Sequence, residues 1–169
     1  GYDLANITFV KGKTGWIVFD PLTAPETAAA AKKLLDKHLG EKPVVAVVYS
    51  HSHVDHWGGV RGIVDEADVR AGKVQIIAPR DFMRFAVSEN VYAGNAMNRR
   101  VQYQYGVQLP ASPFGHAGQG LNMNVASGNT GLIAPSKVIE KDIEVLTVDG
   151  VKMEFLNTPF TEAPSEMHT

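Results

Sequence analysis

A valine-rich apolar run that ends in four potential metal ligands constrains the fold of this chain most strongly. Residues 44–49 read Val-Val-Ala-Val-Val-Tyr, which is typical of a strand buried on both faces of a parallel sheet. The chain continues as Ser50 and then His51-Ser52-His53-Val54-Asp55-His56. A loop at a strand terminus can gather such side chains at the edge of a sheet. The run therefore predicts an α/β domain with a polar site where this strand ends.

The composition limits what that site can bind. The 169 residues contain no cysteine, which excludes disulfides and thiolate ligands, so a metal would be held by histidine and carboxylate. The formal net charge of −2 is too balanced to argue for nucleic acid or an anionic membrane surface. No apolar run reaches the roughly 18 residues of a membrane span, and no signal peptide is visible. We expect one domain that acts on a small molecule.

Hydrophobic periodicity and turn residues predict alternating strands and helices. A strand-rich start, strand–helix units and closing strands are typical of a layered α/β fold. Strands are expected at residues 7–10, 16–19, 44–49, 74–78, 138–139, 143–146 and 151–155. Helices are expected at about 23–38, 81–86 and 95–105, with a short helix after Gly58-Gly59.

Local signals add detail to this outline. Thr23 is expected to cap the first helix, with Leu34 and Leu35 facing the core. Gly58-Gly59 is expected to let the backbone pass close to bound metal. Residues 110–131, rich in glycine, proline, asparagine and serine, are expected to form a long loop. Such a loop is either functional or a surface excursion.

The spacing of the four ligand-type residues favours metal binding. His51 and His53 place two imidazoles on the same side of an extended segment. Asp55 and His56 follow a turn and can face a second point a few ångströms away. Nitrogen and oxygen donors suit zinc, although iron and manganese also fit. The alternative is that these residues form a surface cluster or cap a helix. Four ligand-type residues within six positions disfavour it. His38 and His116 lack such a context, and neither is expected to be a ligand.

A metal site needs a further ligand from elsewhere in the chain, because zinc sites use at least three protein ligands. The segment 158–167 follows a predicted strand, and Glu162 lies there between two prolines. Glu162 is the better ligand candidate, whereas Glu166 is expected beside the site or on a strand. An ordinary acidic turn is the alternative for this segment. Asp20 is a candidate partner for a ligand histidine, or simply part of an Asp-Pro turn.

Together, these motifs resemble the type III alkylsulfatases, a branch of the metallo-β-lactamase superfamily. The general motif of the superfamily is matched by residues 51–59. Three further segments look specific to the branch: Ser88 to Gly106, Gly131 to Pro135 and Thr161 to Met167. Most metallo-β-lactamases carry a histidine at the position that matches Glu162. The resemblance implies an αββα sandwich, of which this α/β chain contains a part.

The resemblance also implies two zinc ions. His51, His53 and Glu162 would bind one, while Asp55 and His56, also expected to be catalytic, would begin the site of the other. The family's bridging acid and a further histidine lie beyond the second motif, as do a dimerisation region and a C-terminal sterol-carrier-like domain. Residues 1–169 are therefore expected to form a partial catalytic domain that is inactive alone. The full-length protein is expected to be a periplasmic or secreted homodimer. Phe160 departs from the family's usual glycine.

The activity implied is hydrolysis of an alkyl sulfate ester, such as dodecyl sulfate, to an alcohol and inorganic sulfate. Paired zinc ions would lower the pKa of a bound water towards about 7, and attack at carbon or at sulfur both fit. Arg99, Arg100, Tyr103 and Tyr105 are candidates for binding the substrate, since guanidinium groups match sulfate oxygens. A solvated helix face is the alternative. The glycine-rich residues 113–131 are candidates for covering the alkyl chain.

Two other functions stay open at this point. The first is a different hydrolase on the same scaffold, such as a lactamase, glyoxalase II or phosphodiesterase; Glu162 and the 88–106 segment argue against it. The second is a metal-binding domain without activity of its own.

Overall fold

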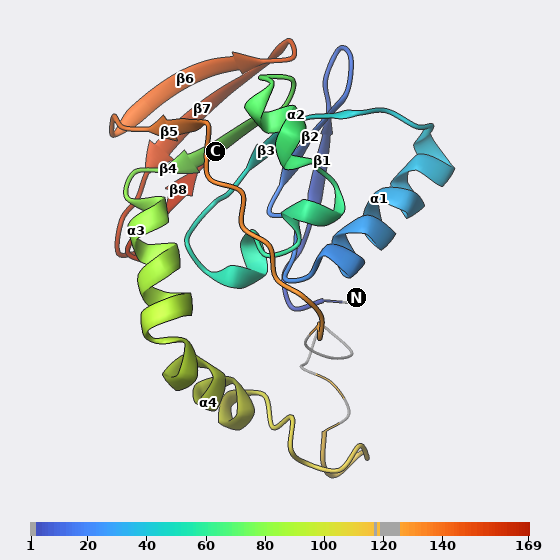
Figure 1. Ribbon diagram of the computed structural model, residues 1–169, viewed down its shortest axis with the longest axis vertical. Coiled ribbons are helices and arrows are strands. Elements are labelled where there is room, and N and C mark those ends of the chain that lie inside the picture. Colours follow the sequence, from blue (N-terminus) through green and yellow to red (C-terminus); the bar gives the residue numbers. More distant parts are fainter. Residues whose placement is uncertain (1–2, 117, 119–125) are drawn as a thin grey trace.

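Two β-sheets packed face to face form the centre of the computed structural model (Figure 1), which describes residues 3–116, 118 and 126–169. The strands are β1 (Thr8–Lys11), β2 (Trp16–Phe19), β3 (Val44–Val48), β4 (Gln75–Pro79), β5 (Lys137–Ile139), β6 (Ile143–Val148), β7 (Val151–Asn157) and β8 (Met167–His168). The α-helices are α1 (Pro25–Leu39), α2 (Glu66–Arg70), α3 (Phe82–Val87) and α4 (Gly94–Gln104). Shorter helical turns are η1 (Val54–His56), η2 (Val60–Gly62) and the π-helix η3 (Ser88–Tyr92).

Parallel pairing in the first sheet sets the position of the site. Its strand order is β1-β2-β3-β4-β5. The β1–β2 hairpin is antiparallel, whereas β2, β3, β4 and β5 pair in parallel. The carboxyl ends of β2, β3 and β4 therefore meet at one edge. The second sheet, β6-β7-β8, is antiparallel throughout.

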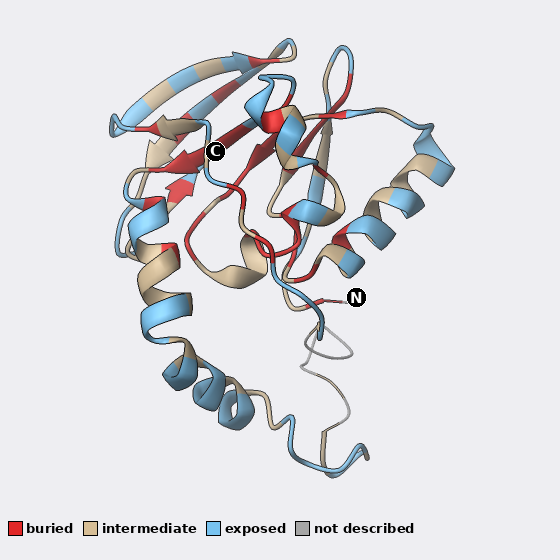
Figure 2. Ribbon diagram, viewed as in Figure 1, coloured by how far each residue is buried: buried red, intermediate tan, exposed pale blue. Residues whose placement is uncertain are grey.

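The side chains of the first sheet divide between two cores. One core lies between the sheet and the helices, where Tyr49 stacks on Phe82 with 5.0 Å between ring centroids. The other lies between the two sheets, where Ile17, Val48 and Phe155 are fully buried. Figure 2 shows this burial in the central strands. Helices, sheet and sheet are three layers of the predicted sandwich, so the expected partial αββα fold is confirmed.

The first helix corrects two expectations. Its N-cap is Ala24 and Pro25 is its first residue, so the prediction that Thr23 caps it was wrong. The Thr23 hydroxyl instead donates to buried Asp3, at 2.7 Å. Leu34 does not face the core either, because 56% of it is exposed, whereas Leu35 packs against the core. The inward face of this helix is narrower than the sequence pattern predicted.

The turn after the metal motif explains Gly58-Gly59. A Cβ on Gly58 would lie 2.2 Å from the carbonyl oxygen of Thr23, and one on Gly59 would lie 2.1 Å from that of Pro21. The backbone approach that these glycines allow is therefore to the loop between β2 and α1. That contact holds the metal motif against the end of β2.

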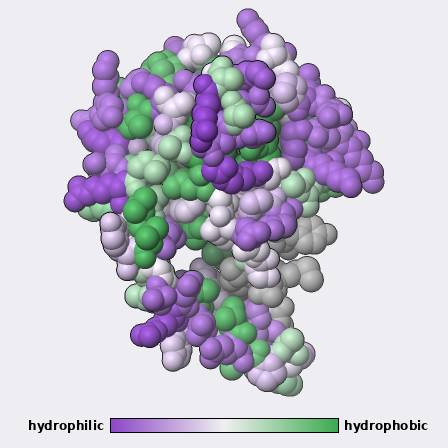
Figure 3. Space-filling model, viewed as in Figure 1, coloured by the Kyte–Doolittle hydropathy of each residue, from purple (hydrophilic) through white to green (hydrophobic). Residues whose placement is uncertain are grey.

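The segment α3–η3–α4 extends away from the sheets (Figure 1). The π-helical turn was not predicted, and such turns are often found at functional sites. No residue of α4 is buried. Figure 3 shows hydrophilic side chains over much of the visible face, with smaller hydrophobic groups scattered between them. No helix among the described residues is long and apolar enough to cross a membrane.

The predicted long loop lies partly outside the described residues, at 117 and 119–125. In its described part Phe114 is fully exposed. The loop ends at Gly131, whose N–H donates to the carbonyl of Gly58 at 2.7 Å. This bond joins the end of the loop to the turn that follows the metal motif.

Candidate metal centre

The ligand-type residues lie at the carboxyl edge of the first sheet, where two distant segments pair. Just beyond β3, the N–H of Ser52 donates to the carbonyl of Ser165, and that of Met167 donates to the carbonyl of Ser50. His51 and Glu166 form an isolated antiparallel bridge. The pairing ties the second motif to the first, which are more than 100 residues apart in sequence, and brings Glu162 to the histidines.

Three side chains converge on one point. His51 Nε2 lies 3.1 Å from His53 Nδ1, and Glu162 Oε1 lies 3.8 Å from each of these nitrogens. Among the described residues, this group is the one in which at least three ligand-type atoms lie within 4.8 Å of one another. His51 is 3% exposed, whereas the Glu162 side chain is 64% exposed. The group therefore has a buried nitrogen side and an open carboxylate side.

The size of this triangle fits zinc. Tetrahedral zinc with bonds of about 2.0–2.2 Å separates its ligand atoms by about 3.3–3.6 Å. The observed sides of 3.1, 3.8 and 3.8 Å lie close to that range. Two imidazoles and one carboxylate also match the nitrogen and oxygen donors that zinc accepts. The residues present therefore fit the metal that the first motif implies.

Asp55 and His56 form a second pair of ligand-type atoms. Asp55 Oδ2 lies 3.2 Å from His56 Nε2, and both residues belong to the η1 turn. The His56 ring lies beside that of His51, with 4.0 Å between centroids. The pair is thus adjacent to the first group and directs an oxygen and a nitrogen to one point.

Asp20 contacts His56 directly and His51 through Ser50. Its Oδ2 accepts from His56 Nδ1 at 2.9 Å and from the Ser50 hydroxyl at 2.7 Å. Because Ser50 donates its proton to Asp20, its oxygen accepts from His51 Nδ1, at 2.9 Å. The Nδ1 atoms of His51 and His56 therefore carry protons, which leaves the Nε2 atom of His51 free to bind a metal. Such carboxylate–histidine contacts fix ring orientation in metal sites.

The charge state of the histidines follows from these neighbours. Burial, together with repulsion from His56 and His53, lowers the pKa of His51. Burial alone would lower the pKa of His56, but hydrogen bonds to Asp20 and Asp55 raise it to about 10. Burial would also raise the pKa of Asp55, yet the hydrogen bond with His56 lowers it. Without a metal, His56 is thus positively charged at neutral pH.

This charge predicts how the metal-free chain responds to alkali. The pKa of His56 is about 10 in the folded chain and about 6.5 in an unfolded one. A raised pKa stabilises the fold fully below about pH 6.5, and this stabilisation is lost as the pH rises towards about 10. We expect the free energy of unfolding, measured by urea titration in EDTA, to fall between pH 7 and 9.5 more steeply for the parent than for His56→Gln. Parallel profiles for the two chains would contradict the assignment.

The turn that carries Glu162 is held by Glu166. The Oε2 atom of Glu166 accepts from the backbone N–H groups of Glu162, at 2.7 Å, and Ala163, at 3.0 Å. Phe160 has a φ of +66° in this turn, a conformation that favours glycine. The glycine expected by resemblance at this position therefore has a backbone reason. His168 is exposed and lies 3.8 Å from Glu166.

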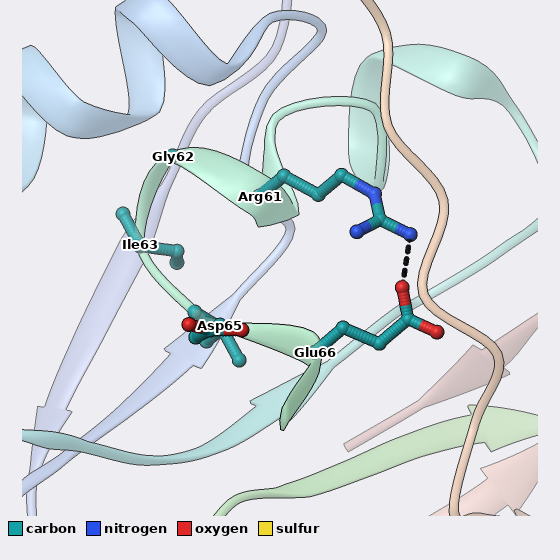
Figure 4. A pocket seen from close by; sticks show the side chains of 6 residues that line it. Arg61, Gly62, Ile63, Asp65 and Glu66 are labelled. Atoms are coloured by element: carbon teal, nitrogen blue, oxygen red, sulfur yellow. Dashed lines mark hydrogen bonds and ion pairs between the residues drawn. The ribbon is translucent and has the colours of Figure 1, made fainter. Parts of the chain in front are cut away.

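Two pockets differ in their relation to this cluster. One of about 330 Å³ opens beside the cluster, and its lining includes His51, His56 and Glu162. Another, of about 380 Å³, lies at η2 and α2, where Arg61 pairs with Glu66 (Figure 4). The Arg61 guanidinium also donates to the carbonyl of Leu132. Arg61 thus joins η2, α2 and Leu132, which follows the long loop. The first pocket is the one that adjoins the candidate site.

The proposed substrate residues divide into two pairs. Burial and the negative charge of Asp55 raise the pKa of Tyr105, and Arg100 opposes this shift. Tyr105 and Arg100 therefore lie within electrostatic reach of the cluster. Tyr103 is 86% exposed, both Arg99 and Arg100 are exposed, and Tyr105 is half-buried. Tyr105 is the one of the four whose pKa responds to Asp55 and Glu162 of the cluster.

Two residues of the site were not assigned from the sequence. Ser50 relays the Asp20 carboxylate to His51, but a serine before a histidine carries no signal of that role. Glu89 Oε1 lies 3.5 Å from His53 Nε2, and burial raises the pKa of Glu89. Glu89 belongs to the 88–106 segment, and the π-helical turn that presents it could not be read from periodicity.

Comparison with known proteins agrees with this geometry. A sequence model of the metallo-beta-lactamase superfamily matches residues 1–169. Over 98% of its length the chain is 54% identical to a linear primary-alkylsulfatase from Pseudomonas sp, and over 99% it is 53% identical to an (R)-specific secondary-alkylsulfatase from Pseudomonas sp. These matches take in 25% and 26% of the relatives, so the chain spans about a quarter of their length.

A solved structure extends the likeness to three dimensions. The stereoselective inverting sec-alkylsulfatase Pisa1 from Pseudomonas sp. superposes with a TM-score of 0.90 at 52% identity. The superposition covers 95% of this chain and 26% of that one. The resemblance to alkylsulfatases expected from the motifs is confirmed by these identities.

Proposed function

Because the chain belongs to the metallo-beta-lactamase superfamily, we propose that it forms the zinc-binding part of an alkylsulfatase. Such an enzyme hydrolyses alkyl sulfate esters, for example dodecyl sulfate, to an alcohol and inorganic sulfate. One observation carries the proposal. A His51–His53–Glu162 triangle of zinc-like size lies in a chain that is 53–54% identical to proteins named alkylsulfatases.

The ligand assignment follows the two groups of side chains. We assign His51, His53 and Glu162 to one zinc ion, and Asp55 with His56 to the start of a second site. Zinc, when bound, supplies Lewis-acid chemistry: it makes water a nucleophile near neutral pH and stabilises charge that develops on oxygen. The chain's own contribution is to hold these donors in place through Asp20 and Ser50.

Asp55 and His56 are the proposed catalytic residues. The lowered pKa of Asp55 keeps its carboxylate ionised at neutral pH, so it can accept a hydrogen bond from an attacking water and orient it. His56 Nε2 lies 3.2 Å from that carboxylate. Their contact limits the rotation of Asp55 and keeps its Oδ2 atom directed into the cluster.

The anionic substrate needs positively charged donors, because Asp55, Glu89 and Glu162 alone would repel a sulfate group. Arg100 is the guanidinium whose charge is felt at Glu89 and at Tyr105. We propose that Arg100 and Tyr105 face the sulfate group, and that Arg99 and the exposed Tyr103 contribute less to binding. Residues 113–131, which we expected to cover the alkyl chain, lie partly outside the described residues.

A metal-binding domain without activity of its own remains the second candidate for the isolated chain. Within residues 3–116, 118 and 126–169, Asp55 and His56 do not join a third ligand-type atom at a separate site. Two protein ligands are fewer than zinc sites use. We therefore expect the 169-residue chain alone to bind about one zinc ion and to hydrolyse dodecyl sulfate poorly or not at all.

A chimera tests the proposal directly. Residues 1–169 would replace the matching segment of the Pseudomonas linear primary-alkylsulfatase, with which the chain shares 54% identity. We expect the chimera to bind zinc, measured by elemental analysis, and to release sulfate from dodecyl sulfate. The same chimera with Glu162→Ala should lose most of both, because one of three ligands is removed.

The controls separate folding from function. Glu41→Ala, an exposed glutamate at the opposite end of β3, should leave the chimera unchanged. A chimera that is folded by circular dichroism and loaded with zinc, yet inactive on a panel of alkyl sulfates, would overturn the substrate assignment. A folded chimera that hydrolyses a lactam, a thioester or a phosphodiester instead would favour another hydrolase of the superfamily.

A further inference from the structure

The three histidines of the cluster are held in a common pattern. Each directs one ring nitrogen into the cluster and the other towards an oxygen. His51 Nδ1 contacts Ser50 Oγ at 2.9 Å, and His56 Nδ1 contacts Asp20 at 2.9 Å. For His53 the outward nitrogen is Nε2, and the oxygen 3.5 Å from it belongs to Glu89. Asp20 and Ser50 thus hold two of the rings, and Glu89 faces the third.

The orientation of His53 makes its outward contact important. Its Nδ1 atom lies 3.1 Å from His51 Nε2 and 3.8 Å from Glu162 Oε1. A metal can bind Nδ1 only when the ring proton is on Nε2. A carboxylate at Nε2 favours that tautomer because it accepts the Nε2–H proton. In that tautomer, two ring nitrogens and a carboxylate oxygen face one point, an arrangement suited to a cation.

Glu89 reaches His53 from a separate element. It lies on η3, the π-helical turn between α3 and α4. The turn is fixed locally, since the Asn90 side chain donates to the carbonyl of Ala86 at 2.9 Å and Ala93 N–H donates to that of Ser88 at 3.0 Å. The Glu89 side chain is 21% exposed. A shift of about half an ångström would bring its oxygen to ordinary hydrogen-bond distance.

We propose that Glu89 is a positioning residue that keeps the His53 ring proton on Nε2 and so prepares Nδ1 for the first metal. The inference rests on the proposed zinc site. It deepens that proposal by naming the residue that orients His53, the ligand histidine that Asp20 and Ser50 do not contact. It also links η3 to the metal, and η3 leads directly into α4, where Arg99, Arg100 and Tyr103 lie. A half-buried ion pair without function is the alternative.

The test compares three variants of the 169-residue chain. Glu89→Leu removes the acceptor, whereas Glu89→Gln keeps an oxygen of similar reach. Glu41→Leu makes the same change at an exposed glutamate remote from the cluster. The dissociation constant for Zn²⁺ is measured by chelator competition, and the tautomer of His53 by ¹⁵N NMR of the metal-free chain. Circular dichroism and thermal unfolding check the fold of each variant.

We expect Glu89→Leu to weaken Zn²⁺ binding about 10- to 100-fold, the range found for such outer contacts. The proton of His53 should move towards Nδ1, where it can be donated to His51 Nε2. Glu89→Gln should recover most of both properties, and Glu41→Leu should match the parent. Parent-like affinity and an unchanged His53 tautomer in Glu89→Leu would overturn the inference.

Failure of the zinc site itself gives a different result. If the parent binds no Zn²⁺ under any condition, the proposed function of the cluster is wrong. The tautomer of His53 in the metal-free chain then still decides whether Glu89 holds its proton. A loss of thermal stability without a tautomer change would show that Glu89 is only structural, and would count against the inference.

Discussion

Replacing His51 by alanine is expected to weaken zinc binding by the chain about 100- to 1,000-fold. Structural zinc sites bind with about 10–16 kcal/mol, which for four ligands is about 2.5–4 kcal/mol each. About 1.4 kcal/mol corresponds to a factor of ten. His51 supplies the buried corner of the triangle. No other described residue places a nitrogen at that corner, so the remaining His53 and Glu162 would be two ligands where three are needed.

Chelator competition with the metal-free chain measures this effect. The same substitution in the chimera measures its effect on sulfate release from dodecyl sulfate. His38→Ala is the matched control, because His38 is an exposed histidine in the last turn of α1. It should bind zinc as the parent does. His51→Ala also leaves a cavity, so circular dichroism must show that the variant is folded. Undiminished zinc affinity in a folded His51→Ala chain would show that the cluster is not the binding site.

How much of this site could be predicted depends on how far apart its parts lie in sequence. The strand 44–49 and the ligands of the following loop are contiguous, so their pattern carries both fold and chemistry. The ligand role of Glu162 could be predicted because this residue follows another strand and stands between two prolines. The distance between Glu162 and the histidines could not be predicted, because it depends on the pairing of residues 165–167 with 50–52.

The residues that sequence reasoning misplaced depend on competition between neighbours. Thr23 has a side chain that can cap a helix, but its hydroxyl donates to Asp3 instead. The helix begins at Pro25, with Ala24 at the N-cap position. Leu34 fits a helical stripe, yet only Leu35 reaches the core. Glu89 depends on a π-helical turn, whose wider spacing no 3.6-residue pattern indicates. Each case is decided by tertiary contacts that a local pattern does not contain.

Asp20→Asn is expected to weaken zinc binding about 10- to 100-fold although the side chain keeps its shape. Asp20 Oδ2 accepts two protons, one from His56 Nδ1 and one from Ser50. An asparagine amide has one oxygen, and its NH₂ group would face a donor. An oxygen that keeps both of these protons would place the NH₂ group against the backbone N–H of Ser50, which donates to Asp20 Oδ1 at 2.8 Å. The reverse orientation would place the NH₂ group against His56 and the Ser50 hydroxyl. Asn also tolerates the φ of +51° found at this position, so backbone strain does not explain the loss.

Ser50→Ala separates the two branches of this network. It removes the relay to His51 but leaves the contact between Asp20 and His56. We expect it to weaken the first zinc ion while leaving the pKa of His56 raised. Asp20→Asn should weaken zinc and also lower that pKa towards its ordinary value, because the carboxylate charge is lost. Chelator competition measures the first effect, and ¹⁵N NMR of the metal-free chain measures the second.

The matched control is Asp142→Asn, which removes the same charge from a residue whose side chain is 85% exposed and paired with Arg80. It should change neither zinc affinity nor the pKa of His56. If Asp20→Asn behaves like Asp142→Asn, the Asp-Pro turn is only a turn, and the carboxylate does not orient the ligands. If Asp20→Asn and Ser50→Ala together cost no more than Asp20→Asn alone, the two residues act in one pathway to His51, because the relay through Ser50 is then useful only while the carboxylate accepts its proton.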